Sequence, residues 1–176
     1  MASKKTAPFM LTERITLPTA GARVSATIDL GSYVDVGDRQ AVMIHSVDFV
    51  FQGTTATESL FDTFGSASSE AIVQVLDLNR GGFSFANDRA LIAGGRLFRE
   101  LQGGLSNESD LYPDNFGKGA LDGRIVVNDQ LYLEGIVTTL DTAKALNVTV
   151  QVTASIVTLS QKDFMAIAIQ STAADN

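Results

Sequence analysis

The sequence predicts an all-β protein, an antiparallel sandwich or barrel of about eight strands. Apolar and polar residues alternate over several stretches, most regularly at the apolar even positions Leu146, Val148, Val150, Val152, Ala154 and Ile156. This period of two is that of a half-buried strand. Excursions rich in Gly, Asn, Asp and Ser separate the stretches, as expected of strand connections. No βαβ alternation is present in the pattern, which argues against an α/β fold.

The elements follow in order along the chain. Residues 1–10 are expected to form a flexible N-terminal arm, because Pro8 disfavours regular structure. A single β-sandwich domain is expected over residues 11–170, followed by a short tail over residues 171–176. Strands are predicted by alternation or by β-branched content over residues 11–17, 22–30, 41–52, 70–78, 124–127, 131–140 and 146–159.

The stretch over residues 41–52 changes phase in its middle. Val42 and Ile44 set one phase and Val47, Phe49 and Phe51 set the other. A β-bulge at His45-Ser46, which adds one residue and reverses the facing of the strand, is one explanation. A strand that is apolar on both faces is the other.

Four segments are less regular. Residues 53–69 form a long excursion with room for one helical turn, Arg96–Leu101 is compatible with a short helix, and residues 103–123 are expected to be a loop. The segment Gln161–Ala173 has two interpretations. Ser160 with Asp163 fits the start of a helix, whereas alternation and abundant isoleucine favour a further strand, which is the preferred prediction.

Composition excludes several classes of function. The chain has 176 residues and no cysteine, so disulfides, zinc–thiolate sites and thiol catalysis are excluded. Its net charge of −7 gives it no general electrostatic attraction to nucleic acid. No apolar run reaches the length of about 18 residues that a membrane helix needs. The N-terminus lacks the apolar core of a signal peptide, which predicts synthesis in the cytoplasm.

No catalytic motif is present in the sequence, so neither an enzyme nor a cofactor is expected. The single histidine, His45, lies within a predicted strand and is interpreted as structural. Asp110 and Asp114 are the candidate calcium ligands, although their spacing is not that of an EF-hand and a solvated loop is favoured. Phe83 and Phe85 are interpreted as core or interface residues, because no basic groove accompanies them.

Long strands, few charges and wide loops without chemistry favour self-assembly. Charged residues are 19% of the chain, fewer than is usual for an isolated soluble domain. Assembly with copies of itself would bury apolar surface that a monomer leaves exposed. It would also give the long excursions a purpose as contacts with a partner.

Two segments carry a resemblance to a known family. "ARVSATIDLGSYVDVGDRQAVMIHSVDFVFQG" (residues 22–53) reads as a strand, a loop and a second strand, and "LYLEGIVTTLDTAKALNVTVQVTASIVTL" (residues 131–159) reads as two strands joined by a short turn. With the N-terminal arm, this order resembles the single jelly-roll coat proteins of icosahedral viruses. The resemblance is one of pattern over most of the chain, and no site residue is carried across.

The resemblance implies an antiparallel jelly-roll β-sandwich that stands in a virion shell. Partners would be copies of the chain and possibly a second coat protein. The assembly arm contains Lys4, Lys5 and Pro8 but no dense Arg/Lys run, so weak or no direct contact with nucleic acid is expected. In this it looks more like the coats of tailless DNA viruses, some of which line an internal membrane.

Two other functions fit the same features. One is a β-rich filament, tail or appendage subunit, in which the arm adds a strand to a neighbouring sheet. The other is a ligand- or carbohydrate-binding β-domain, with its site near Asp110 and Asp114.

Overall fold

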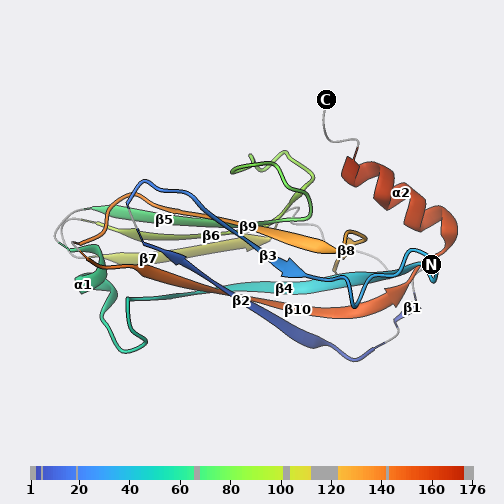
Figure 1. The fold of residues 1–176 in the computed structure, drawn as a ribbon, viewed down its shortest axis with the longest axis horizontal. Coiled ribbons are helices and arrows are strands. Elements are labelled where there is room, and N and C mark those ends of the chain that lie inside the picture. Colours follow the sequence, from blue (N-terminus) through green and yellow to red (C-terminus); the bar gives the residue numbers. More distant parts are fainter. Residues whose placement is uncertain are drawn as a thin grey trace.

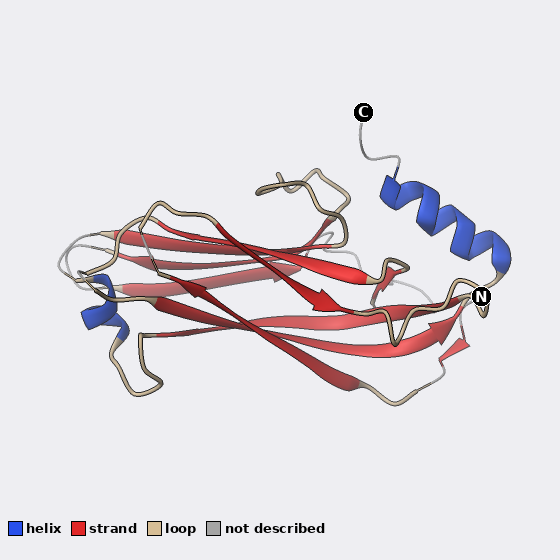
Figure 2. Ribbon diagram, in the orientation of Figure 1, coloured by secondary structure: helices blue, strands red, loops and turns tan. Residues whose placement is uncertain are grey.

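The protein is an all-β sandwich of two antiparallel sheets packed face to face (Figures 1 and 2). The structure is a computed structural model that describes residues 3–4, 6–18, 20–65, 68–100, 104–111, 123–141 and 143–172. The first sheet contains β1 (Ser3–Lys4), β2 (Phe9–Leu17), β4 (Gln40–Gln52), β8 (Arg124–Val126) and β10 (Leu146–Thr158). The second contains β3 (Val24–Asp29), β5 (Ser69–Leu76), β6 (Leu91–Arg99), β7 (Leu105–Leu111) and β9 (Gln130–Val137). The two helices are α1 (Leu60–Phe64) and α2 (Gln161–Thr172).

Strand pairing is nested along the chain. β2 pairs with β10, β3 with β9, β4 with β8, and β5 with β6, each pair antiparallel. The first sheet therefore runs β2-β10-β4-β8, with β1 continuing the β2 side of β10, and the second runs β3-β9-β5-β6-β7. Strands of the first half of the chain thus pair with strands of the second half, and successive pairs alternate between the two sheets.

The core lies between the sheets and follows the sequence alternation. In β10 the predicted even positions are buried as far as Ala154, while the odd positions before it are half-buried. These side chains meet those of the facing sheet, such as Val73, Leu131 and Leu133, each fully buried. Two β-sheets with one apolar face each can remove those faces from water only by such stacking.

The phase change in β4 is a β-bulge at His45. Thr153 pairs with Ser46 and Ala154 pairs with Ile44, so His45 is the extra residue. The second explanation also holds over part of the strand. Val42 and Ile44 belong to the core between the sheets, whereas Ala41 and Met43 belong to a second buried cluster. Because side chains alternate across a strand, that cluster lies on the opposite face of β4.

The preferred strand over Gln161–Ala173 is wrong, because Gln161–Thr172 form the helix α2. Ser160 Oγ accepts the backbone N–H of Asp163 (3.1 Å), and Phe164 N–H donates to Ser160 C=O (2.9 Å). These bonds satisfy donors that a first helical turn leaves free. Phe164, Ile167 and Ala168 contribute to the second buried cluster, and their i, i+3, i+4 spacing is the period of a helix and not of a strand.

Two further segments differ from expectation. The sequence of Arg96–Leu101 is compatible with a short helix, but Arg96 lies in β6, where Gly94 and Gly95 pair with Gln74 and Val73. Within the loop expected over residues 103–123, Leu105–Leu111 form the strand β7. Local composition is misleading in both segments, because pairing with a neighbouring strand outweighs the weak preferences of Gly, Asn and Asp. The helical turn expected within residues 53–69 is confirmed as α1.

Candidate functional site

The predicted calcium ligands are Asp110 and Asp114, and the structure describes only the first of them. Asp110 lies in β7 and pairs with Gly94. Within the described ranges, no group of three or more acidic or histidine side chains could hold a metal ion. The calcium site at these two residues stays a prediction.

The described part of the predicted arm lies along the sandwich's own sheet. Ser3 and Lys4 pair with Thr158 and Val157 of β10. Ile156 N–H donates to Thr6 Oγ1 (3.0 Å). Lys5 lies outside the described residues, and Pro8 is exposed just before β2 begins. The arm is thus a short extension of the β2 edge.

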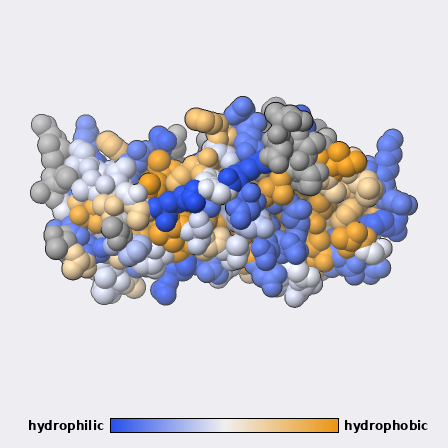
Figure 3. Space-filling model, turned by 45° about the horizontal axis from the view of Figure 1, so that its top comes forward, coloured by the Kyte–Doolittle hydropathy of each residue, from blue (hydrophilic) through white to orange (hydrophobic). Residues whose placement is uncertain are grey.

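The end of the sandwich that carries α2 also exposes apolar side chains. On the helix, Met165 is 54% exposed and Ile169 is 58% exposed, although Phe164 next to Met165 is buried. Figure 3 shows hydrophobic atoms gathered toward this end (right), among hydrophilic ones. No helix in the described ranges is long and apolar enough to cross a membrane.

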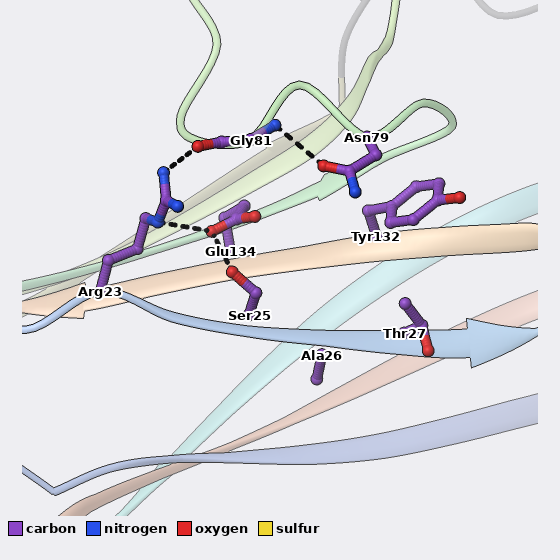
Figure 4. A pocket seen from close by; sticks show the side chains of 8 residues that line it. All are labelled: Arg23, Ser25, Ala26, Thr27, Asn79, Gly81, Tyr132 and Glu134. Atoms are coloured by element: carbon purple, nitrogen blue, oxygen red, sulfur yellow. Dashed lines mark hydrogen bonds and ion pairs between the residues drawn. The ribbon is translucent and has the colours of Figure 1, made fainter.

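A polar hollow opens on the outer side of the second sheet, beside the loop that follows β5. Its volume is about 470 Å³, and β3, β9 and the loop residues line it, namely Arg23, Ser25, Ala26, Thr27, Asn79, Gly81, Tyr132 and Glu134. Ser25 and Thr27 extend to one side of β3 and Ala26 to the other (Figure 4). This alternation follows from the pleat of the strand. The sandwich thus supplies a rigid floor, and the loop supplies one wall.

A buried carboxylate organises the hollow. Glu134 is 4% exposed. Its Oε2 accepts a hydrogen bond from Ser25 Oγ (2.8 Å) and lies 3.4 Å from Arg23 Nε in an ion pair. Arg23 also donates to the carbonyl of Gly81 and so ties β3 to the loop. A carboxylate removed from water needs such partners, because an unpaired buried charge is costly.

The loop over residues 77–90 is held by its own side chains. Arg80 and Asp88 form a bidentate ion pair, in which Arg80 Nε donates to Asp88 Oδ2 (3.0 Å) and Arg80 Nη2 donates to Asp88 Oδ1 (3.2 Å). Gln74 of β5 bonds both the N–H and the C=O of Ser84 (2.9 Å each). Figure 1 shows this loop (green) standing above the second sheet. These bonds fix the loop while leaving Phe85 86% exposed and Phe83 37% exposed, so neither ring belongs to the core of a single subunit.

An ion pair closes the same loop at its base. Asp77 is 3% exposed, and its Oδ2 accepts from Arg124 Nη2 (2.9 Å). Asp77 Oδ1 is buried and has no hydrogen-bond partner among the described residues. Burial raises the pKa of the Asp77 carboxyl above its usual range, and the ion pair with Arg124 offsets only part of this effect.

Substituting Asp77 should therefore change the pH dependence of stability. A raised pKa means that the folded state holds the proton more tightly than the unfolded state, so this carboxyl penalises folding increasingly as pH rises through the raised pKa. The Asp77→Asn variant has no such titration. We expect its unfolding free energy, relative to the parent, to increase between about pH 3 and pH 7. Urea unfolding of both proteins across this range measures the difference, and a difference that is flat or decreases contradicts the expectation.

His45 lies at the bulge of β4. Its Nε2 lies 2.9 Å from Ser155 Oγ of the neighbouring strand β10. Ser155 is fully buried and pairs with Met43. The bond joins the two longest strands where their register shifts.

Sequence reasoning missed the polar hollow, because its residues come from three distant segments. Glu134 is the one charged residue of β9, and its alternation with the core residues Leu131 and Leu133 places it on the outer face of the sheet. The pattern therefore predicts exposure, and it does not reveal that Glu134 is buried beneath the loop. The partner could not be inferred without the pairing of Glu134 with Ser25.

Comparison with known proteins adds no assignment, since the chain matches no family model and no curated protein.

Proposed function

We propose that the protein is a structural subunit with a jelly-roll sandwich, which assembles with copies of itself into the shell of an icosahedral virus. The nested pairing carries the proposal. A jelly roll is a long antiparallel ribbon rolled into two sheets, so its first strand pairs with its last and its second with the last but one. The pairs β2–β10, β3–β9, β4–β8 and β5–β6 follow this scheme, with β7 added at the edge. Such sandwiches are common in viral capsids but also in lectins and cupins.

Exposed apolar side chains support the assembly part of the proposal. Met10 on β2 is 61% exposed, Phe98 on β6 is 40% exposed, and Met165 and Ile169 extend from α2. Single exposed apolar residues are ordinary, but these lie on both sheets and on the terminal helix. Contacts among several neighbours, as in a closed shell, would bury them all.

Electron microscopy of the purified full-length chain tests the proposal directly. We expect closed particles or capsomers of uniform size. A protein that stays monomeric at high concentration, by light scattering and by negative stain, would overturn the proposal.

Deleting residues 1–8 separates a shell from a filament built by strand exchange. In this chain Ser3 and Lys4 already pair with β10, so a filament would require the arm to leave its own sheet and pair with a neighbour. If the faces of the sandwich form the shell, the deletion should leave particles intact, since β2 begins at Phe9. The Thr6→Val variant, which loses only the bond to Ile156, is the matched control. Loss of all assembly on deletion would favour the filament.

A further inference from the structure

We propose that the polar hollow between β3, β9 and the 77–90 loop binds a neutral saccharide. This inference does not depend on the function proposed above.

The charges of this site do not favour a strongly ionic ligand. Arg23 and Glu134 neutralise one another across 3.4 Å, and the remaining polar lining residues, Ser25, Thr27, Asn79 and Tyr132, are uncharged. Because the two charges compensate one another, the site attracts neither an anion nor a cation strongly. A neutral ligand can use the polar groups without breaking the ion pair.

Hydrogen-bond capacity favours hydroxyl groups as the ligand. Glu134 uses only Oε2 in its bonds to Arg23 and Ser25. Figure 4 draws the second carboxylate oxygen with no partner among the lining residues. Asn79 accepts from Gly81 N–H through Oδ1 (2.9 Å), which leaves its amide N–H groups as donors. Glu134 thus offers an acceptor and Asn79 offers donors in the same hollow, and a hydroxyl group can both donate and accept.

One aromatic ring supplies an apolar surface for saccharide recognition. Tyr132 is half-buried and lines the hollow. Phe83 and Phe85 lie on the loop that carries Asn79 and Gly81, but they are not among the residues that line the hollow. The C–H face of a sugar ring packs on a ring such as that of Tyr132, and a loop ordered by the ion pair and amide bonds described above does not lose that entropy on binding. The volume of about 470 Å³ lies in the range of small-molecule sites, about 300–1,000 Å³.

Ligand-observed saturation-transfer NMR on the full-length protein tests the site, because the method works for a free subunit and for a large particle. The neutral probes are the methyl glycosides of glucose, galactose, mannose and N-acetylglucosamine, and the charged probes are glucuronate and glucosamine. We expect saturation transfer to at least one neutral probe and none to the charged probes.

Two variants locate the binding. Asn79→Asp keeps the oxygen that accepts the N–H of Gly81 but removes the amide donors that line the hollow, and should weaken binding about three- to tenfold. Thr27→Val removes a hydroxyl from an exposed strand position while keeping the side chain's shape, and should weaken binding about fivefold. Val36→Ser, which removes a 70% exposed apolar side chain elsewhere, is the control and should leave affinity unchanged.

Three results would overturn the proposal. They are no transfer to any neutral probe, transfer to the charged probes only, and binding that neither Asn79→Asp nor Thr27→Val weakens. Both substituted side chains are exposed, so loss of folding does not explain a change in either variant. Because the readout is ligand binding, the result is independent of whether particles form.

Discussion

Replacing Phe164 by alanine is expected to lower the unfolding free energy by about 3 kcal/mol and to release α2 from the sheet. Phe164 is 5% exposed and packs in the second buried cluster with Ala41, Met43 and Val157. A 12-residue helix is marginal in water on its own. Without the Phe164 ring, α2 loses the packing against the sheet that stabilises it as a helix. Denaturant unfolding and hydrogen exchange of the α2 amides measure the two parts of the effect.

Met165→Ala is the matched control for this prediction. Met165 is the next residue of the same helix but is 54% exposed, so its truncation should change stability by less than about 0.5 kcal/mol. Equal effects of the two substitutions, or full protection of the α2 amides in Phe164→Ala, would show that Phe164 does not anchor the helix.

Gly95→Ala is expected to destabilise the sandwich by about 3 kcal/mol, the upper end for overpacking a core. An added Cβ at Gly95 would lie 2.5 Å from Cγ of Phe49 on the facing sheet and 3.0 Å from its Cβ. These atoms are close to the backbone of β4, so the ring cannot move aside freely. The two sheets would have to separate locally. Chemical denaturation of the variant gives the loss.

Two further substitutions test the cause. Gly104→Ala introduces the same methyl group where no atom lies within 4 Å, and it should cost little. Phe49→Leu should cost less in the Gly95→Ala protein than in the parent, because the smaller side chain relieves the contact. Additive effects would mean that Gly95 is needed for a reason other than room for Phe49.

Much of the fold could be predicted from the sequence, because alternation is a local signal. β10 and β3 fall within their predicted ranges, β2 begins two residues before its predicted range, and the phase change at His45 located the bulge. The sequence did not predict which strands pair, since pairing depends on contacts between distant residues. It therefore could not place Glu134 beside Ser25 and Arg23, or bring Asn79 to the same hollow.

The C-terminal segment shows why periodicity alone is insufficient. Phe164, Ala166 and Ala168 alternate as in a strand, and Phe164, Ile167 and Ala168 also follow a helical period. The cap at Ser160 decides between them, together with the apolar outer face of β4 that the helix covers. The sequence indicated that outer face only through the second explanation for residues 41–52, namely a strand that is apolar on both faces.

The nested pairing also determines when the protein can fold. Thr16 of β2 donates to Asn147 Oδ1 of β10 over 2.7 Å, although the two residues are 131 positions apart. β10 also joins β2 to β4, so the first sheet cannot close until the ribosome has synthesised the chain as far as β10. Folds dominated by such distant contacts close slowly. In a nascent chain, the edges of β2 and β4 that pair with β10 therefore stay exposed until β10 has been synthesised. Exposed strand edges are prone to aggregation, so the chain has the greatest need of chaperones during this interval.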